Sequence, residues 1–200
     1  MLYFFIYLLK PLLWLIFRPK VYGNKKALGT KGGVIFICNH ISMIDPLILG
    51  IVSPRVIHFM AKKEIFDHPV GKLLFKAFFA FPVSRGTADI KSIKNAIKVL
   101  EDGKAFGIFP EGRRMVADVM DEFELGTSMI AMRTGVPVVP IYLHMRAYKM
   151  ARPKMIVGDP IYAADSALEG ASRRENELVF TQRIMNRMNA LKRELDDICG

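Results

Sequence analysis

The sequence predicts an α/β fold with a mostly parallel central sheet flanked by helices. Short apolar runs rich in β-branched residues recur along the chain, and helical patterns separate several of them. The chain has 200 residues, 52% of them apolar and 24% charged, which is enough for one packed core. This composition excludes a disordered or collagen-like protein.

The predicted strands are continuous apolar runs, a pattern typical of strands buried on both faces. They cover residues 34–38, 56–60, 79–83, 105–109, 136–143 and 154–157. The predicted helices lie between several of these strands, at residues 46–51, 70–78, 88–100 and 126–133. A charged segment at residues 172–198 keeps apolar residues at helical spacing, so we expect an amphipathic helix to end the fold.

The first seventeen residues are apolar except for Lys10. As one helix they would extend ~25 Å at ~1.5 Å per residue, less than the ~30 Å hydrocarbon core of a bilayer. Pro11 is expected to interrupt that helix, and neither a basic leading region nor a signal-peptide cleavage site is present. We therefore expect an interfacial membrane-associating segment at residues 1–20 and one domain at residues 21–200, with a buried first helix of the core as the alternative.

The net charge of +10 is concentrated in the first hundred residues, which carry +11, while the second hundred carry −1. A basic half that is also the most apolar indicates an anionic membrane surface at least as strongly as nucleic acid. Because the aromatic residues cluster in the apolar runs and do not interleave with basic residues, no nucleic-acid partner is expected. The two cysteines, Cys38 and Cys199, have no metal-ligand spacing and fit a reducing compartment.

The first strand is followed by Asn39-His40, at the kind of strand end where α/β sheets place ligands. Histidine is largely neutral at pH 7 and readily accepts a proton, which makes His40 a candidate general base. Asp45 can return to the imidazole across one helical turn and hold its tautomer. Ser42 and Asp45 also have the spacing of a helix capping box, and that alternative stays open. Cys38 is interpreted as an inert core thiol.

A second candidate site is Phe109-Pro110-Glu111-Gly112-Arg113-Arg114, which also follows an apolar run. Glycine lets the backbone approach a ligand closely, and two guanidinium groups can hold a phosphate. A turn with solvated arginines is the alternative. Arg85-Gly86 follows a third predicted strand, so three strand ends are expected to share one polar pocket at one edge of the sheet.

In their order and spacing, these blocks resemble the conserved blocks of the glycerolipid acyltransferases, in particular the lysophosphatidic acid acyltransferase family. Asn39-His40 with Asp45 is similar to the N-H-x-x-x-x-D block, and Phe109-Pro110-Glu111-Gly112 with Arg114 is similar to the F-P-E-G-T-R block. Three further segments resemble family blocks: Arg85-Gly86, Lys62-Lys63-Glu64 and Val136-Pro137-Val138-Val139-Pro140. The resemblance covers residues 32–142.

The resemblance implies acyl transfer from acyl-CoA or acyl-carrier protein to the free hydroxyl of a lysophospholipid acceptor, with phosphatidic acid as the product. It implies that His40 is the base and Asp45 its partner, and that the acceptor is held by Arg85, Glu111, Gly112 and Arg114. Arg113 is a further candidate for binding the acceptor, because a second guanidinium group can help to hold a phosphate. Neither a cofactor nor a metal is implied, and the enzyme is expected on the cytoplasmic face of the cell membrane.

The sequence departs from the family pattern at positions that are expected to affect which acceptor the enzyme binds. Arg113 stands where the family has threonine, Met115 where serine is common, and residues 118–124 form an acidic segment in place of a basic one. The predicted catalytic pair is intact. An acyltransferase for a different acceptor is therefore the alternative: another lysophospholipid, a lyso-aminolipid or glycerol 3-phosphate.

Overall fold

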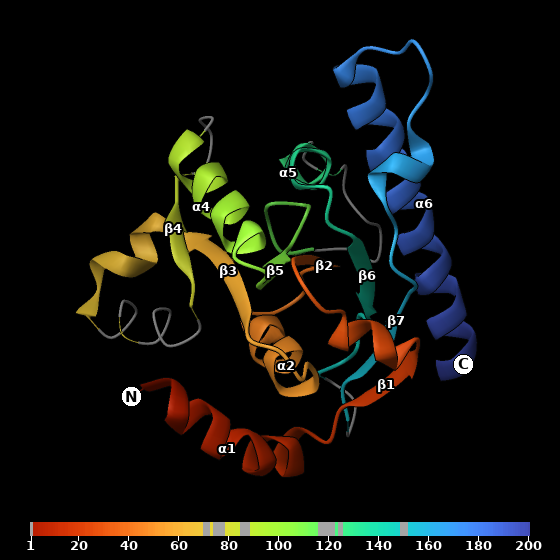
Figure 1. Ribbon diagram of the computed structural model, residues 1–200. Coiled ribbons are helices and arrows are strands. Elements are labelled where there is room, and N and C mark those ends of the chain that lie inside the picture. Colours follow the sequence, from red (N-terminus) through yellow and green to blue (C-terminus); the bar gives the residue numbers. More distant parts are fainter. Residues whose placement is uncertain are drawn as a thin grey trace.

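The computed structural model describes residues 2–69, 73, 79–84, 89–115, 123, 126–148 and 152–200. It confirms the predicted α/β class, with a seven-stranded sheet in the order β1-β7-β6-β2-β5-β3-β4 (Figure 1). The strands are β1 (Lys20–Gly23), β2 (Val34–Cys38), β3 (Ile57–Lys62), β4 (Phe81–Val83), β5 (Ala105–Ile108), β6 (Val138–Leu143) and β7 (Lys154–Val157).

Parallel pairing dominates the sheet, as predicted. β2 pairs in parallel with β5 on one side and β6 on the other, and β3 pairs in parallel with β5 and β4. β7 runs antiparallel to β6 and parallel to β1. The carboxyl ends of β2, β5 and β6 therefore meet at one edge of the sheet, where α/β folds place ligands.

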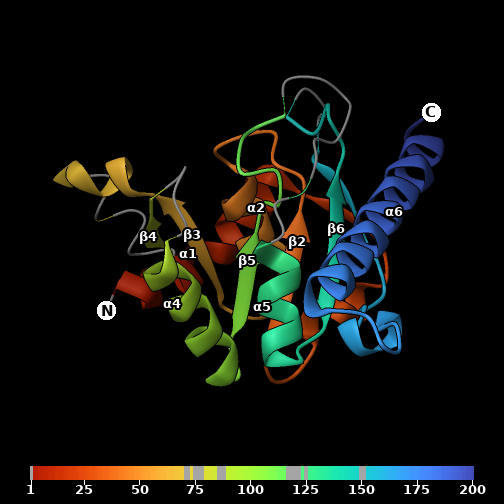
Figure 2. The same cartoon turned by 90° about the horizontal axis from the view of Figure 1, so that it is seen from above.

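Helices cover both faces of the sheet. The longer ones are α1 (Leu2–Phe17), α2 (Asp45–Val52), α4 (Ile90–Glu101), α5 (Gly126–Thr134) and α6 (Arg173–Cys199). Short 3₁₀ turns lie at Lys25–Gly29, Lys63–Asp67 and Ala163–Ser166. Figures 1 and 2 show α1 and α2 on one face and α4, α5 and α6 side by side on the other.

The central strand β2 is buried on both faces, as its continuous apolar run predicts. Phe36 packs into the core beneath α2, whereas Ile35 and Ile37 pack into the core beneath α4, α5 and α6. Gly107 of β5 is needed for close strand packing, because a Cβ atom there would run into the ring of Phe59 on β3. The two cores fix the strand ends that carry the candidate site.

The N-terminal region differs from the prediction in two ways. First, Pro11 does not interrupt the first helix, since α1 runs from Leu2 to Phe17 with Pro11 inside it. A proline removes one backbone hydrogen bond and can be accommodated where the rest of the helix is supported. Second, β1 was not predicted, because its four residues, with a lysine at one end and glycine at the other, become a strand only by pairing with β7.

The predicted helix at residues 70–78 lies mostly outside the described residues. Within the described part of the chain, no helix combines the length and the apolar character needed to cross a bilayer.

Candidate active site

The first and second candidate motifs meet at the ends of two neighbouring strands. Ile37 of β2 lies opposite Ile108 of β5, so the residues that follow each strand emerge side by side. The Phe109 ring stacks on the His40 imidazole, with centroids 4.3 Å apart and planes 24° from parallel. The backbone N–H of Met115 donates to the His40 carbonyl at 2.7 Å, which ties the second motif to the first.

The predicted contact between His40 and Asp45 is present, with Nδ1 2.7 Å from Oδ2. The Asp45 carboxylate is fully buried, and the His40 side chain is 13% exposed. Because an ionised carboxylate only accepts hydrogen bonds, Nδ1 is the donor, and in the neutral imidazole Nε2 therefore carries the lone pair. A neutral imidazole fixed in this tautomer can accept a proton at Nε2.

Both oxygens of Asp45 accept hydrogen bonds from neighbouring groups. Besides His40, Oδ2 accepts from the backbone N–H of Ile41 at 2.7 Å and of Ser42 at 2.8 Å. The bond from Ser42 is half of the capping box that the spacing allowed. The other half is absent, because the N–H of Asp45 donates to the Ser42 carbonyl and the hydroxyl accepts from Ile44. One carboxylate therefore organises both the turn before α2 and the imidazole.

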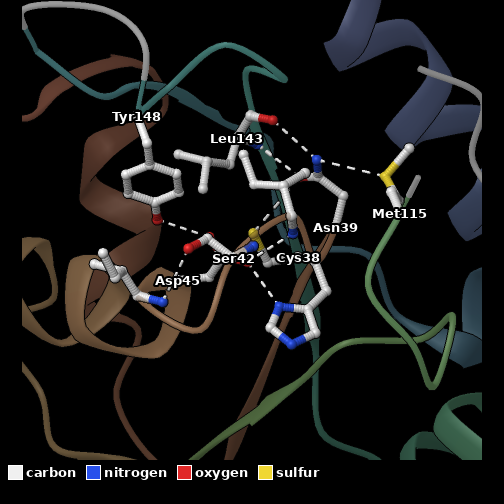
Figure 3. A network of polar contacts seen from close by, with 10 residues as sticks. Cys38, Asn39, Ser42, Asp45, Met115, Leu143 and Tyr148 are labelled. Atoms are coloured by element: carbon white, nitrogen blue, oxygen red, sulfur yellow. Dashed lines mark hydrogen bonds and ion pairs between the residues drawn. The ribbon is translucent and has the colours of Figure 1, made fainter. Parts of the chain in front are cut away.

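The motifs did not reveal Tyr148, whose hydroxyl donates to Oδ1 of Asp45 at 2.6 Å (Figure 3). Burial and then the negative charge of Asp45 raise the pKa of Tyr148 far above its ordinary value, so the phenol remains a donor. Tyr148 lies 103 residues from Asp45, in the turn after β6. The only signal in the sequence was its place beyond a predicted strand, at the same edge of the sheet.

Asn39 joins the strand that carries His40 to the end of β6. Its side-chain oxygen accepts from the Leu143 N–H at 2.7 Å, and its amide nitrogen donates to the Leu143 carbonyl at 2.9 Å. Asn39 is fully buried. The Asn39 side-chain amide thus takes the place of a backbone hydrogen bond between β2 and β6, at the point where the two strands stop pairing.

Cys38 has the properties of the core thiol that the sequence indicated. It is fully buried, and burial, followed by the charges of Asp45 and Glu111, raises its pKa well above the ordinary value. A thiol held in the protonated form is a poor nucleophile. The chemistry of this edge therefore centres on the imidazole.

Four of the five candidate acceptor-binding residues lie in and after the turn that follows β5. Glu111 is buried, 6% exposed, whereas Arg113 and Arg114 are exposed beside it. Gly112 takes a positive φ of 63°, a conformation that favours glycine, and donates to the Phe109 carbonyl at 3.2 Å. Arg85 lies outside the described residues, two positions after β4, which is separated from β5 by β3.

Comparison with known proteins identifies the family to which this site belongs. A family model described as "Acyltransferase" matches residues 18–144, a range that contains His40, Asp45 and the whole second motif. The chain belongs to the acyltransferase family. This acyltransferase is 34% identical over 197 residues to a Bacillus subtilis protein named 1-acyl-sn-glycerol-3-phosphate acyltransferase, with 95% of this chain and 96% of that protein covered.

Two further comparisons, one of sequence and one of structure, give matches to proteins described as acyltransferases. A Borreliella burgdorferi protein of the same name is 30% identical over 144 residues, which cover 68% of this acyltransferase and 55% of that protein. The crystal structure of the 1-acyl-sn-glycerophosphate acyltransferase from Thermotoga maritima superposes with a TM-score of 0.69 and 21% identity, covering 96% and 79% of the two chains. This structural match shows the shared fold.

Proposed function

We propose that this enzyme is a 1-acyl-sn-glycerol-3-phosphate acyltransferase, which moves an acyl chain from acyl-CoA or acyl-carrier protein to the free hydroxyl of lysophosphatidic acid. The observation that carries the proposal is the His40–Asp45 pair, with Nδ1 held by a buried carboxylate and Nε2 left to act as a base. The full-length similarity to the Bacillus subtilis protein of that name supports the choice of acceptor.

The proposed reaction needs no covalent intermediate on the enzyme. Nε2 of His40 takes the proton of the acceptor hydroxyl, and the oxygen attacks the thioester carbonyl, forming the new C–O bond. The tetrahedral intermediate collapses with cleavage of the C–S bond, and the proton on the imidazolium can neutralise the departing thiolate. Asp45 stabilises the imidazolium between these two steps.

An acceptor panel tests the proposed function. The enzyme is assayed with an acyl thioester and, in turn, lysophosphatidic acid, lysophosphatidylcholine, lysophosphatidylglycerol and glycerol 3-phosphate. Arg114→Ala should raise the KM for lysophosphatidic acid about tenfold or more, because it removes a charge-assisted contact to the phosphate. Arg174→Ala, which removes an exposed arginine on α6, is the control. Preference for another acceptor, or an unchanged KM in Arg114→Ala, would contradict the assignment.

We further propose that α1 docks the enzyme on an anionic membrane, at the cytoplasmic face of the cell membrane. Leu13 and Phe17 pack against the core, and the Lys10 ammonium donates to the Ser53 carbonyl, so α1 is fastened to the domain. Its other side is apolar and exposed: Leu12, Leu15 and Ile16 are 52%, 59% and 61% exposed. A contiguous apolar surface of this kind marks an interaction site.

The surroundings of α1 suit a lipid headgroup region. A pocket of about 550 Å³ lies beside the helix, and its lining includes Trp14, Lys20, Tyr22 and Lys25. Tryptophan and tyrosine favour the level of the headgroups, and lysine attracts anionic lipid. In this proposal, the exposed side of α1 is the predicted interfacial segment, and its other side packs on the core, as the alternative expected.

The double variant Leu15→Ser/Ile16→Ser should weaken co-sedimentation with phosphatidylglycerol vesicles about tenfold or more, because two large apolar side chains no longer enter the interface. Since both residues are exposed, the fold should be unaffected. Leu178→Ser, at a 50% exposed leucine on α6, is the matched control. Undiminished binding by the double variant would refute docking through α1.

A further inference from the structure

We propose that Tyr148 is a positioning residue of the acyl-transfer site, which fixes the plane of the Asp45 carboxylate and thereby the orientation of the His40 imidazole. The inference builds on the proposed role of His40 as base. Tyr148 lies beyond residues 18–144, the range matched by the family model.

The hydrogen bonds around Asp45 give Tyr148 a distinct position. His40, Ile41 and Ser42, which are consecutive in the chain, all bond to Oδ2. The Tyr148 hydroxyl bonds to the other oxygen, Oδ1, at 2.6 Å. A carboxylate held through one oxygen can still tilt about its Cβ–Cγ bond, whereas donors on both oxygens fix its plane. Tyr148 supplies the donor to the second oxygen.

The turn that carries Tyr148 is itself fixed to the strand of the base. Asn39, next to His40, makes two hydrogen bonds with the Leu143 backbone. Beyond Leu143, the N–H of His144 donates to the Lys154 carbonyl at 3.0 Å, and the N–H of Ala147 donates to the His144 carbonyl at 2.8 Å. Asn39 thus connects the strand of the base to the segment that orients its carboxylate, as Figure 3 shows.

The bond is also partly buried, and its donor keeps its proton. Asp45 is fully buried, and Tyr148 is packed against the core beneath α2. The phenol stays protonated because burial and the Asp45 charge raise its pKa. A permanent donor at 2.6 Å is suited to holding an ionised carboxylate.

Tyr148→Phe tests the proposal, since it removes one oxygen and keeps the ring that packs on the core. We expect kcat per folded molecule to fall about tenfold, with KM for acceptor and donor within about twofold, because a charge-assisted bond that acts on the base is lost. A merely structural tyrosine would lower the melting temperature and leave kcat per folded molecule unchanged. Tyr162→Phe, at an exposed tyrosine, is the control.

A double-mutant cycle with Asp45→Ala, which leaves no side-chain partner for the Tyr148 hydroxyl, tests whether the effect passes through Asp45. In that background Tyr148→Phe should cost less than about twofold in kcat, because its partner carboxylate is already gone. A full additional loss in the double variant, or a wild-type kcat in Tyr148→Phe, would overturn the proposal.

Nitrogen NMR of the His40 ring gives a readout that requires no turnover and no knowledge of the acceptor. The wild type should show one neutral tautomer, protonated at Nδ1, and Tyr148→Phe should show a mixture of tautomers. The same single tautomer in both would overturn the proposal. A wrong acceptor would show instead in the panel described above and would leave this measurement unaffected.

Discussion

Replacement of His40 by alanine should lower kcat about 10²- to 10⁴-fold, the usual contribution of a positioned general base. The reason is geometric: Asp45 holds Nδ1 at 2.7 Å, so the imidazole presents Nε2, the nitrogen able to take the proton of an acceptor hydroxyl. Cys38 offers no alternative route, since burial raises the pKa of its thiol. Initial rates with saturating acyl thioester and lysophosphatidic acid measure the effect.

The loss in His40→Ala should not come from unfolding. Asp45 keeps the two backbone donors and the Tyr148 hydroxyl after the imidazole is removed, so no buried charge is left without hydrogen bonds. His68→Ala, at an exposed histidine outside the site, is the control and should retain the wild-type rate. A kcat in His40→Ala within about tenfold of the wild type would show that another group is the base.

The sequence predicted the fold well where the signal was local. β2 is an unbroken apolar run that is buried from end to end, and its short length, its β-branched residues and the glycines before it are typical of a buried strand. The pair of His40 and Asp45 was equally predictable, because five residues span a single turn of chain. Neither required knowledge of the strand order.

The rest of the site depended on contacts between distant segments. β1 has no pattern of its own and exists by pairing with β7. Tyr148 reaches Asp45 only because β6 lies next to β2 in the sheet, an adjacency that periodicity does not reveal. The predicted meeting of the first two motifs, by contrast, follows from the general rule that parallel strands end at one edge, and β2 and β5 are in fact neighbours.

Asp45→Asn should lower kcat about 10²- to 10³-fold, the cost of removing one preorganised electrostatic stabiliser. The asparagine oxygen can take the place of Oδ2, because that position faces three donors, in His40, Ile41 and Ser42. Its amide then faces Tyr148, whose hydroxyl can turn to accept. The fold and the tautomer of His40 are therefore retained, and what is lost is the negative charge that stabilises the imidazolium.

The magnitude of this effect separates two roles for Asp45. If its charge matters, Asp45→Asn is slow although its circular dichroism and melting temperature stay close to those of the wild type. If the carboxylate only holds the turn before α2, the variant keeps its kcat to within about tenfold, because the amide oxygen still accepts from the backbone N–H groups of Ile41 and Ser42. Asp102→Asn, which removes a carboxylate paired with Lys98 and Lys104 at the opposite edge of the sheet, is the matched control and should leave kcat unchanged.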